Sequence, residues 1–260
     1  MSLLRMNLKL LRASFLRPFL FAAVAGVVLT TTVLAKTAAG LHYLKAGQPN
    51  PAELLAPPPL PDSAEQAADM AAVIAVSKAC SSNQVALAFS EKKFSMFTFA
   101  SAIGSSLAPG KLPRTEAFFE YVQQDAASLA DLGKDYWKRP RPFTVNPDLA
   151  SGKLEKSFGY PSGHGTEGLV LALVLAELVP DQREAILAIG RDLGWHRVWI
   201  GRHYPTDIYA GRVLAHAIVR QMRANPDFQH DLAEAKAEMA STARTAETPI
   251  QPPVPAAAAH

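Results

Sequence analysis

Residues 161–179 read Pro161-Ser-Gly-His-Gly-Thr-Glu-Gly-Leu-Val-Leu-Ala-Leu-Val-Leu-Ala-Glu-Leu-Val179. This stretch predicts a helix that follows Ser162, a favoured N-cap residue, and ends near Val179. Apolar residues fall on nearly every side, which is typical of a helix in the middle of a bundle. The start of this helix, in contrast, is polar and contains glycine. Gly163 lets a ligand approach the backbone, and the free N–H groups of a helix start favour an anion, which His164 would face.

Helical patterns continue on both sides of this segment, and no convincing alternating strand pattern occurs. We therefore expect an all-α fold, a single-domain helical bundle with its helical domain at 62–224. The flanking helices are predicted to run from Ser63 to about Ala79, from Pro113 to about Gly133, from a cap at Asp181 to about Val198, and from a cap at Thr206 to about Ala224. An apolar, Phe-rich stretch covers 84–105, and Pro140, Pro142 and Pro147 predict a non-helical connection.

Composition excludes several classes of protein. The chain has 260 residues, of which 49% are hydrophobic and 19% charged, so it is not a disordered, collagen-like or coiled-coil chain. A single cysteine, Cys80, excludes an internal disulfide framework and a thiolate metal cluster. Only one stretch is long enough to cross a bilayer, which argues against a polytopic membrane protein.

The N-terminal residues 1–39 resemble a secretory signal peptide. A basic start precedes an apolar run from Pro18 to Ala35, and small residues follow it. Cleavage and a periplasmic location are expected, with no stable membrane association afterwards. The alternative, an uncleaved membrane anchor, stays open because 18 residues are borderline for a span.

The N-terminal residues 1–39 also account for the positive net charge of the chain. The net charge is +3, but residues 1–39 carry five basic and no acidic residues, so the remainder has a net charge of −2. We therefore expect no nucleic-acid polymer as partner.

A Pro-rich lead-in segment covers 40–61, and the 225–260 tail is expected to be largely disordered at its end. The oligomeric state is left open, with a homodimer expected if an apolar face is exposed.

Two further polar clusters stand out. One is Lys134-Asp-Tyr-Trp-Lys-Arg-Pro-Arg141-Pro142, in which Arg141 projects from a Pro-fixed backbone. The other is Arg197-Val-Trp-Ile-Gly-Arg-His203-Tyr-Pro-Thr-Asp207, in which Asp207 can reach one imidazole nitrogen of His203 and leave the other basic. Each cluster alone also fits a basic loop or a helix-end contact. Together with residues 161–164 they supply cations, an oriented imidazole and a second histidine, which are the groups needed for phosphoryl transfer without a metal.

The three clusters together resemble a known family. Lys134-x6-Arg141-Pro142, Pro161-Ser162-Gly163-His164 and Arg197-x5-His203-x3-Asp207 form the pattern of the type-2 phosphatidic acid phosphatase superfamily, which includes vanadium haloperoxidases, lipid phosphate phosphatases and bacterial acid phosphatases. The lead-in residues Tyr43-Leu44 and Leu54-Leu55-Ala56-Pro57-Pro58-Pro59 are most similar to the bacterial class A non-specific acid phosphatases. The resemblance extends from about residue 42 to about 224.

The resemblance implies a secreted acid phosphatase that hydrolyses small phosphomonoesters with broad specificity and without a metal or other cofactor. His203 would be the nucleophile that forms a phosphohistidine, Asp207 would orient it, and His164 would be the general acid and base. Lys134, Arg141, Ser162, Gly163 and Arg197 would bind the phosphate. Vanadate is expected to bind as a mimic, and transfer of the phosphoryl group to an alcohol is a plausible side activity.

Two positions depart from the family pattern. His196 stands where the family usually has Ser, and Gly165 stands where related phosphatases have Thr. We expect His196 to add a titratable group near the site, and Gly165 to loosen the helix start and widen the pocket. The alternative functions are a vanadium-dependent haloperoxidase and a lipid phosphate phosphatase. Lys138 and Arg139 are interpreted as residues of the pocket edge or the solvent-facing surface.

Overall fold

The computed structural model describes residues 40–45 and 47–247, and this part of the chain is all-α, without a β-strand. The predicted signal sequence at 1–39 and the predicted disorder at the end of the tail, 248–260, lie outside the described residues. The elements are α2 (Pro51–Leu54), α3 (Ala64–Ala79), α4 (Ser82–Ser90), η1 (Met96–Phe99), α5 (Ala100–Ile103), α6 (Pro113–Trp137), α7 (Pro142–Val145), η2 (Pro147–Leu149), α8 (Gly163–Leu178), η3 (Pro180–Gln182), α9 (Arg183–Trp199), α10 (Pro205–Arg223) and α11 (Pro226–Glu247).

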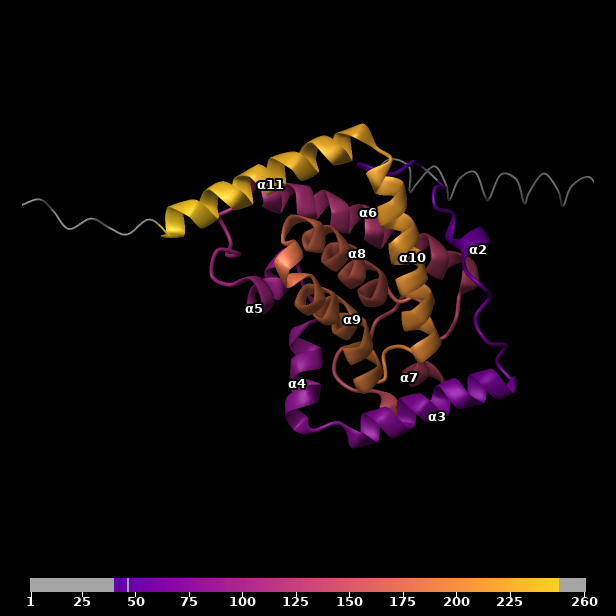
Figure 1. The fold of residues 1–260 in the computed structure, drawn as a ribbon. Coiled ribbons are helices and arrows are strands. Elements are labelled where there is room, and N and C mark those ends of the chain that lie inside the picture. The colour runs from indigo at the N-terminus through magenta and orange to yellow at the C-terminus, as the bar shows by residue number, and fades with distance from the viewer. Residues whose placement is uncertain (1–39, 46, 248–260) are drawn as a thin grey trace, which may run out of the picture.

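Helix α8 occupies the centre of the bundle, as its all-round apolar pattern predicted. Figure 1 shows it enclosed by α6, α9 and α10. Nearly all of its residues are buried, and Val170, Leu171 and Val174 have no exposed surface. Ser162 caps it as expected, because its Oγ accepts a hydrogen bond of 3.1 Å from the backbone N–H of Gly165.

Glycines let α9 approach α8 closely. A Cβ atom on Gly190 of α9 would lie 2.4 Å from the Cβ of Ala172 and 2.8 Å from the carbonyl oxygen of Gly168, both on α8. Any larger residue at 190 would therefore push the helices apart. Since α8 carries His164 and α9 carries Arg197, this close packing fixes the distance between two predicted site residues.

The structure corrects several predicted boundaries. Asp181 lies inside η3 and the N-cap of α9 is Gln182, while Thr206 is already helical because Pro205 takes the first position of α10. The apolar stretch at 84–105 is divided among α4, η1 and α5. The Pro-rich connection contains two short helical turns, α7 and η2, because Pro142 and Pro147 each fit a first helical position.

The helical domain continues beyond residue 224, which was its predicted end. Helix α11 packs along α6, as Figure 1 shows. Phe228 is fully buried, and the side chain of Thr115 on α6 donates a hydrogen bond of 2.7 Å to Glu238. Helix α11 is rich in Ala and has few buried positions, so its amphipathic pattern is weak in the sequence.

The lead-in segment is tied to the bundle by a buried carboxylate. Asp125 on α6 accepts hydrogen bonds from the backbone N–H groups of His42, Tyr43 and Leu44 at 2.7, 2.8 and 3.1 Å. Most of the described part of the segment is non-helical, but Pro51–Leu54 forms the single turn α2 with Asn50 as its N-cap.

No single helix among residues 40–45 and 47–247 is long and apolar enough to cross a membrane. The bent pair formed by α3 and α4 meets that criterion by length and composition only.

Candidate active site

Six of the eight predicted site residues line one cavity of about 270 Å³. They are Lys134, Arg141, Gly163, His164, Arg197 and His203. Asp131, Glu155, Ser157, Glu167 and Ala127 complete the lining. A larger groove of about 540 Å³ lies between the Pro-rich segment and α10, but Glu65 is its only charged lining residue. The three sequence clusters therefore meet at the smaller, polar cavity.

Helix ends bring these residues together. Lys134 lies in the last turn of α6 and Arg197 in the last turn of α9. His164 lies in the first turn of α8, and His203 belongs to the short connection between α9 and α10. The first N–H groups of α8 have no intrahelical acceptor, so this end of the cavity favours an anion.

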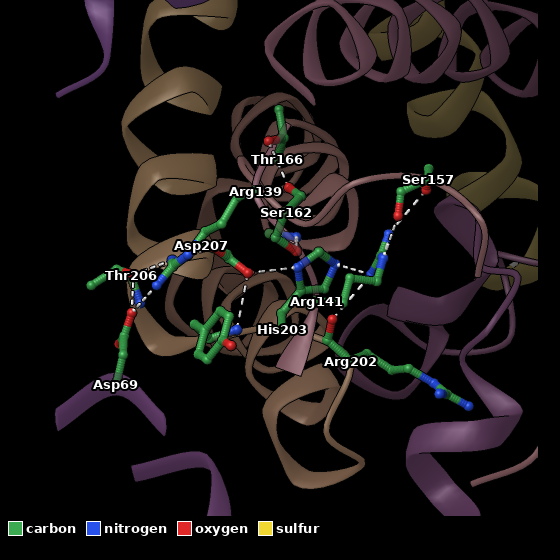
Figure 2. A network of polar contacts seen from close by, with 12 residues as sticks. Asp69, Arg139, Arg141, Ser157, Ser162, Thr166, Arg202, His203, Thr206 and Asp207 are labelled. Atoms are coloured by element: carbon green, nitrogen blue, oxygen red, sulfur yellow. Dashed lines mark hydrogen bonds and ion pairs between the residues drawn. The ribbon is translucent and has the colours of Figure 1, made fainter. Parts of the chain in front are cut away.

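The contacts of His203 determine its tautomer. Nε2 lies 3.0 Å from Nη1 of Arg141, and a guanidinium can only donate, so Nε2 is unprotonated and accepts this hydrogen bond. The proton is therefore on Nδ1, which donates to Oδ2 of Asp207 at 3.1 Å. Figure 2 shows the ring held between these two partners. The basic nitrogen faces the cavity and Asp207 lies behind it, as the spacing of these residues predicted.

Arg139 holds Asp207 from the other side and is the residue that sequence reasoning missed. Its side chain is 4% exposed and does not line the cavity, so it takes neither of the two predicted positions, the pocket edge or the solvent-facing surface. Nη1 donates to Oδ1 of Asp207 at 2.6 Å, and Nη2 donates to Oδ2 of Asp69 on α3 at 2.7 Å. Figure 2 shows this chain from Asp69 through Arg139 and Asp207 to His203. A buried arginine needs such partners, so it is structural and electrostatic support for the histidine.

Arg141 is oriented by backbone and hydroxyl oxygens. Nε donates to the carbonyl oxygen of Ser157 at 2.7 Å, and Nη2 donates to its Oγ at 3.1 Å. Nη1 also donates to the carbonyl oxygen of Arg202 at 3.0 Å. These contacts fix the planar fork of the guanidinium before any ligand arrives.

The other two cations have carboxylate neighbours in the cavity. Nζ of Lys134 lies 2.6 Å from Oδ1 of Asp131, and Nη2 of Arg197 lies 3.5 Å from Oε1 of Glu155. Glu155 also pairs with Arg202, which is buried. An incoming anion would compete with these carboxylates for the same cations.

His164 is held by a backbone contact. Nε2 lies 3.0 Å from the carbonyl oxygen of Glu91, which can only accept, so Nε2 carries the proton. Its ring also packs against Phe94, with ring centroids 4.9 Å apart. Glu91 follows α4, and Arg197 donates to the carbonyl oxygen of Ala88 in the same segment at 2.7 Å. The end of α4 thus forms part of the wall of the site.

Burial and the surrounding cations keep both histidines neutral. Burial, followed by Arg197, Lys134 and Arg141, lowers the pKa of His164 to about 3. Burial, followed by Arg141, lowers the pKa of His203 well below its ordinary value. Burial raises the pKa of Asp207 to about 7, against the opposing effect of Arg139. The site therefore combines three cations with two neutral imidazoles.

Two predicted residues take other places. The hydroxyl of Ser162 is used as the helix cap and does not line the cavity, and Gly165 does not line it either. A Cβ on Gly165 would lie 3.3 Å from the carbonyl oxygen of Ile208 on α10. The expectation that Gly165 widens the pocket was wrong, because this position faces α10.

Comparison with known proteins gives a consistent assignment. Residues 121–227 match the sequence profile of the PAP2 superfamily. An acid phosphatase of Zymomonas mobilis is 30% identical over 209 residues, which are 77% of this chain and 79% of that protein. A non-specific acid phosphatase of Providencia stuartii is 36% identical over 149 residues, which are 55% of this chain and 60% of that protein.

The chain belongs to the PAP2 superfamily and to its acid phosphatase group. The matched residues 121–227 contain all three clusters of this PAP2 phosphatase, from Lys134 to Asp207. A transmembrane PAP2-type phosphatidylglycerolphosphate phosphatase from Bacillus subtilis has a TM-score of 0.44 and 19% identity, covering 76% of this chain and 94% of that structure. That likeness is too weak to add to the assignment.

Proposed function

We propose that this enzyme is a secreted acid phosphatase that hydrolyses small phosphomonoesters with broad specificity. The observation that supports the proposal best is the orientation of His203, whose unprotonated Nε2 faces a cavity with three cations. Fixed positive charge suits the non-bridging oxygens of a phosphate, and an oriented neutral imidazole suits attack on phosphorus.

The reaction would proceed in two steps. Nε2 of His203 attacks phosphorus, a P–N bond forms, the P–O ester bond breaks, and His164 gives a proton to the leaving alkoxide. Water then attacks phosphorus, the P–N bond breaks, and His164 takes the proton from the water. Asp207 holds the Nδ1 proton of His203 throughout. An alcohol in place of water would give phosphotransfer.

Binding of the phosphate has to change the state of His164. Its pKa of about 3 arises from burial and from the nearby cations, so the group is neutral in the empty site at the pH of an acid phosphatase. A bound dianion offsets those cations and raises the pKa, which would let His164 act as an acid. Arg141 would also exchange its hydrogen bond to His203 for one to the phosphate.

The proposal includes independence of metals and location in the periplasm. Among the described residues, no group of three or more His, Cys, Asp or Glu side chains is placed to hold a metal ion. Secretion rests on the sequence of residues 1–39 alone.

Hydrolysis of a chromogenic phosphomonoester by the purified full chain tests the proposal. The assay covers pH 4–8 with EDTA present, and His203→Ala is the comparison. We expect metal-independent hydrolysis that the substitution abolishes, and label from a ³²P-substrate retained on the protein by alkaline quenching. A His203→Ala variant with wild-type activity would overturn it. Bromide oxidation with added vanadate and peroxide, without ester hydrolysis, would favour the haloperoxidase alternative.

A further inference from the structure

One carboxyl group in the cavity has no role in the two-step reaction. Glu167 lies on α8, three residues after His164, and its side chain lines the same cavity as Lys134 and His203. Among the described residues it forms no ion pair within 4.0 Å. Its hydrogen-bond partner is Gln123 on α6, whose Nε2 donates to Oε2 at 3.2 Å.

This carboxyl group lies beside Gly163. A Cβ placed on Gly163 would lie 3.2 Å from Oε1 of Glu167 and 3.3 Å from Nζ of Lys134. Both side chains therefore border the same small space at the start of α8. A phosphate that uses Lys134 and the free N–H groups of Gly163 and His164 would have to share this space with Glu167.

The second oxygen of the carboxyl group, Oε2, accepts the hydrogen bond from Gln123. Nε2 of Gln123 also donates to the carbonyl oxygen of Phe94 at 3.3 Å, so the amide is fixed between two acceptors. An amide N–H can donate to either the neutral or the ionised carboxyl group. The contact holds Glu167 in the cavity without deciding its charge.

We propose that Glu167 is a pH-dependent gate on this cavity, and that only its neutral form leaves Lys134 and the helix start free for a phosphate dianion. The ionised form would repel the dianion and compete with it for Lys134. This inference rests on the proposed phosphatase function and adds a residue that limits the enzyme to acidic conditions.

Burial raises the pKa of Glu167 to about 7, against the effects of Gln123 and Lys134, and Asp131 adds to the increase. The group is therefore neutral below that pH and ionises as the pH rises through it. Binding of a dianion favours the neutral form. Phosphate affinity is then retained at acidic pH and falls about tenfold per pH unit above about 7.

Other titratable and charged groups face the same region. Asp131 and Lys134 come from α6, His164 from α8, Arg197 from α9, and Arg141, Glu155 and His203 from the connecting segments. Asp207 behind His203 also has a pKa of about 7, and phosphate has its own second ionisation. These groups are the same in a wild-type protein and a Glu167 variant, so only the difference between the two proteins reports on Glu167.

The experiment measures binding of inorganic phosphate by calorimetry from pH 5 to pH 9 with the full chain. It compares the wild type with Glu167→Gln, which keeps the shape, and Glu167→Leu, which needs no hydrogen bond. We expect similar affinities at pH 5 and affinities about tenfold tighter for both variants at pH 8. Glu177→Gln is the matched control, because Glu177 lies on the same helix and pairs with Arg223.

The same proteins are assayed for hydrolysis of a chromogenic phosphomonoester. We expect the alkaline limb of kcat/KM to move to higher pH in both variants. Equal pH dependence of phosphate binding in all proteins would overturn the gate, as would variants that bind phosphate weakly at every pH. Phosphate binding without hydrolysis by the wild type would instead overturn the proposed function. The comparison of phosphate binding between the wild type and the Glu167 variants would still test the gate.

Discussion

The Nδ1 atom of His196 lies 2.7 Å from Oε2 of Glu91. The backbone carbonyl of the same Glu91 accepts the hydrogen bond from His164, so one residue contacts both histidines. The ring of Trp199 also packs against that of His196, with ring centroids 3.9 Å apart. His196, which departs from the family pattern, therefore connects α9 to the end of α4 beside the cavity.

His196→Ser is expected to remove the contact between α9 and Glu91 while leaving hydrolysis intact. Both side chains are mostly buried, so losing the contact should lower the free energy of unfolding by about 1–2 kcal/mol. His164 would lose a fixed backbone partner, and the pH–rate profile would shift. Denaturant titration and a pH series of kcat check this. His216→Ser, at an exposed site on α10, is the control; equal profiles and stabilities in both variants would contradict the prediction.

Gly165→Thr is expected to reduce stability without changing the ranking of substrates. The new side chain would press on Ile208 and on the Cβ of Ser162, both 3.3 Å from the position of the Cβ. Overpacking of this kind costs about 1–3 kcal/mol. Thermal unfolding of Gly165→Thr is compared with Gly40→Ala, where a Cβ has no neighbour within 4 Å. A broadened substrate range at unchanged stability is the result that would refute this reading.

Arg139→Gln is expected to damage both folding and turnover. It leaves Asp69 and Asp207 buried without their shared cation, at a cost of about 3–5 kcal/mol. Because Arg139 lowers the pKa of Asp207, its loss would raise that pKa further and weaken the hydrogen bond that Asp207 accepts from His203, so kcat should fall about a hundredfold with a smaller change in KM. Arg139→Lys retains the positive charge, so we expect smaller losses of kcat and of unfolding free energy than in Arg139→Gln. Steady-state kinetics and denaturant titration of both variants check this. Unaltered kcat and unaltered stability in the Arg139→Gln variant would contradict this role.

The pKa of His164 is expected to rise when an anion binds. Three cations depress it in the empty site, and a dianion such as vanadate compensates them. The His164 ring signal in proton NMR spectra, assigned with His164→Gln, is followed over pH 4–8 with and without vanadate. A ring that stays neutral throughout in the presence of vanadate would exclude it as the proton donor.

Sequence reasoning succeeded where the chemistry is local. Ser162 and His164 lie within one helix start, and His203 and Asp207 are four residues apart across another, so backbone geometry alone brings them together. The all-round apolar pattern of residues 169–178 likewise located the central helix.

Sequence reasoning failed where the contact is distant. Arg139 is 70 residues from Asp69, and His196 is 105 residues from Glu91. A charged residue that is buried against such a partner resembles a solvated one when only its neighbours in sequence are considered. The available signal was Pro140 next to Arg139, because a proline marks the end of a helix and α6 ends at Trp137 with Lys138 as its C-cap.

The connection from Asp69 to His203 has a consequence for heat inactivation. Helix α3 lies at the margin of the bundle in Figure 1, where Val73 packs into a small cluster with Val198, Tyr204 and Ile208. Its detachment would expose little apolar surface and would therefore require less free energy than global unfolding. Turnover should thus fail at a lower temperature than the far-ultraviolet signal of the remaining helices, and α3 amides should exchange with solvent deuterium over the same interval.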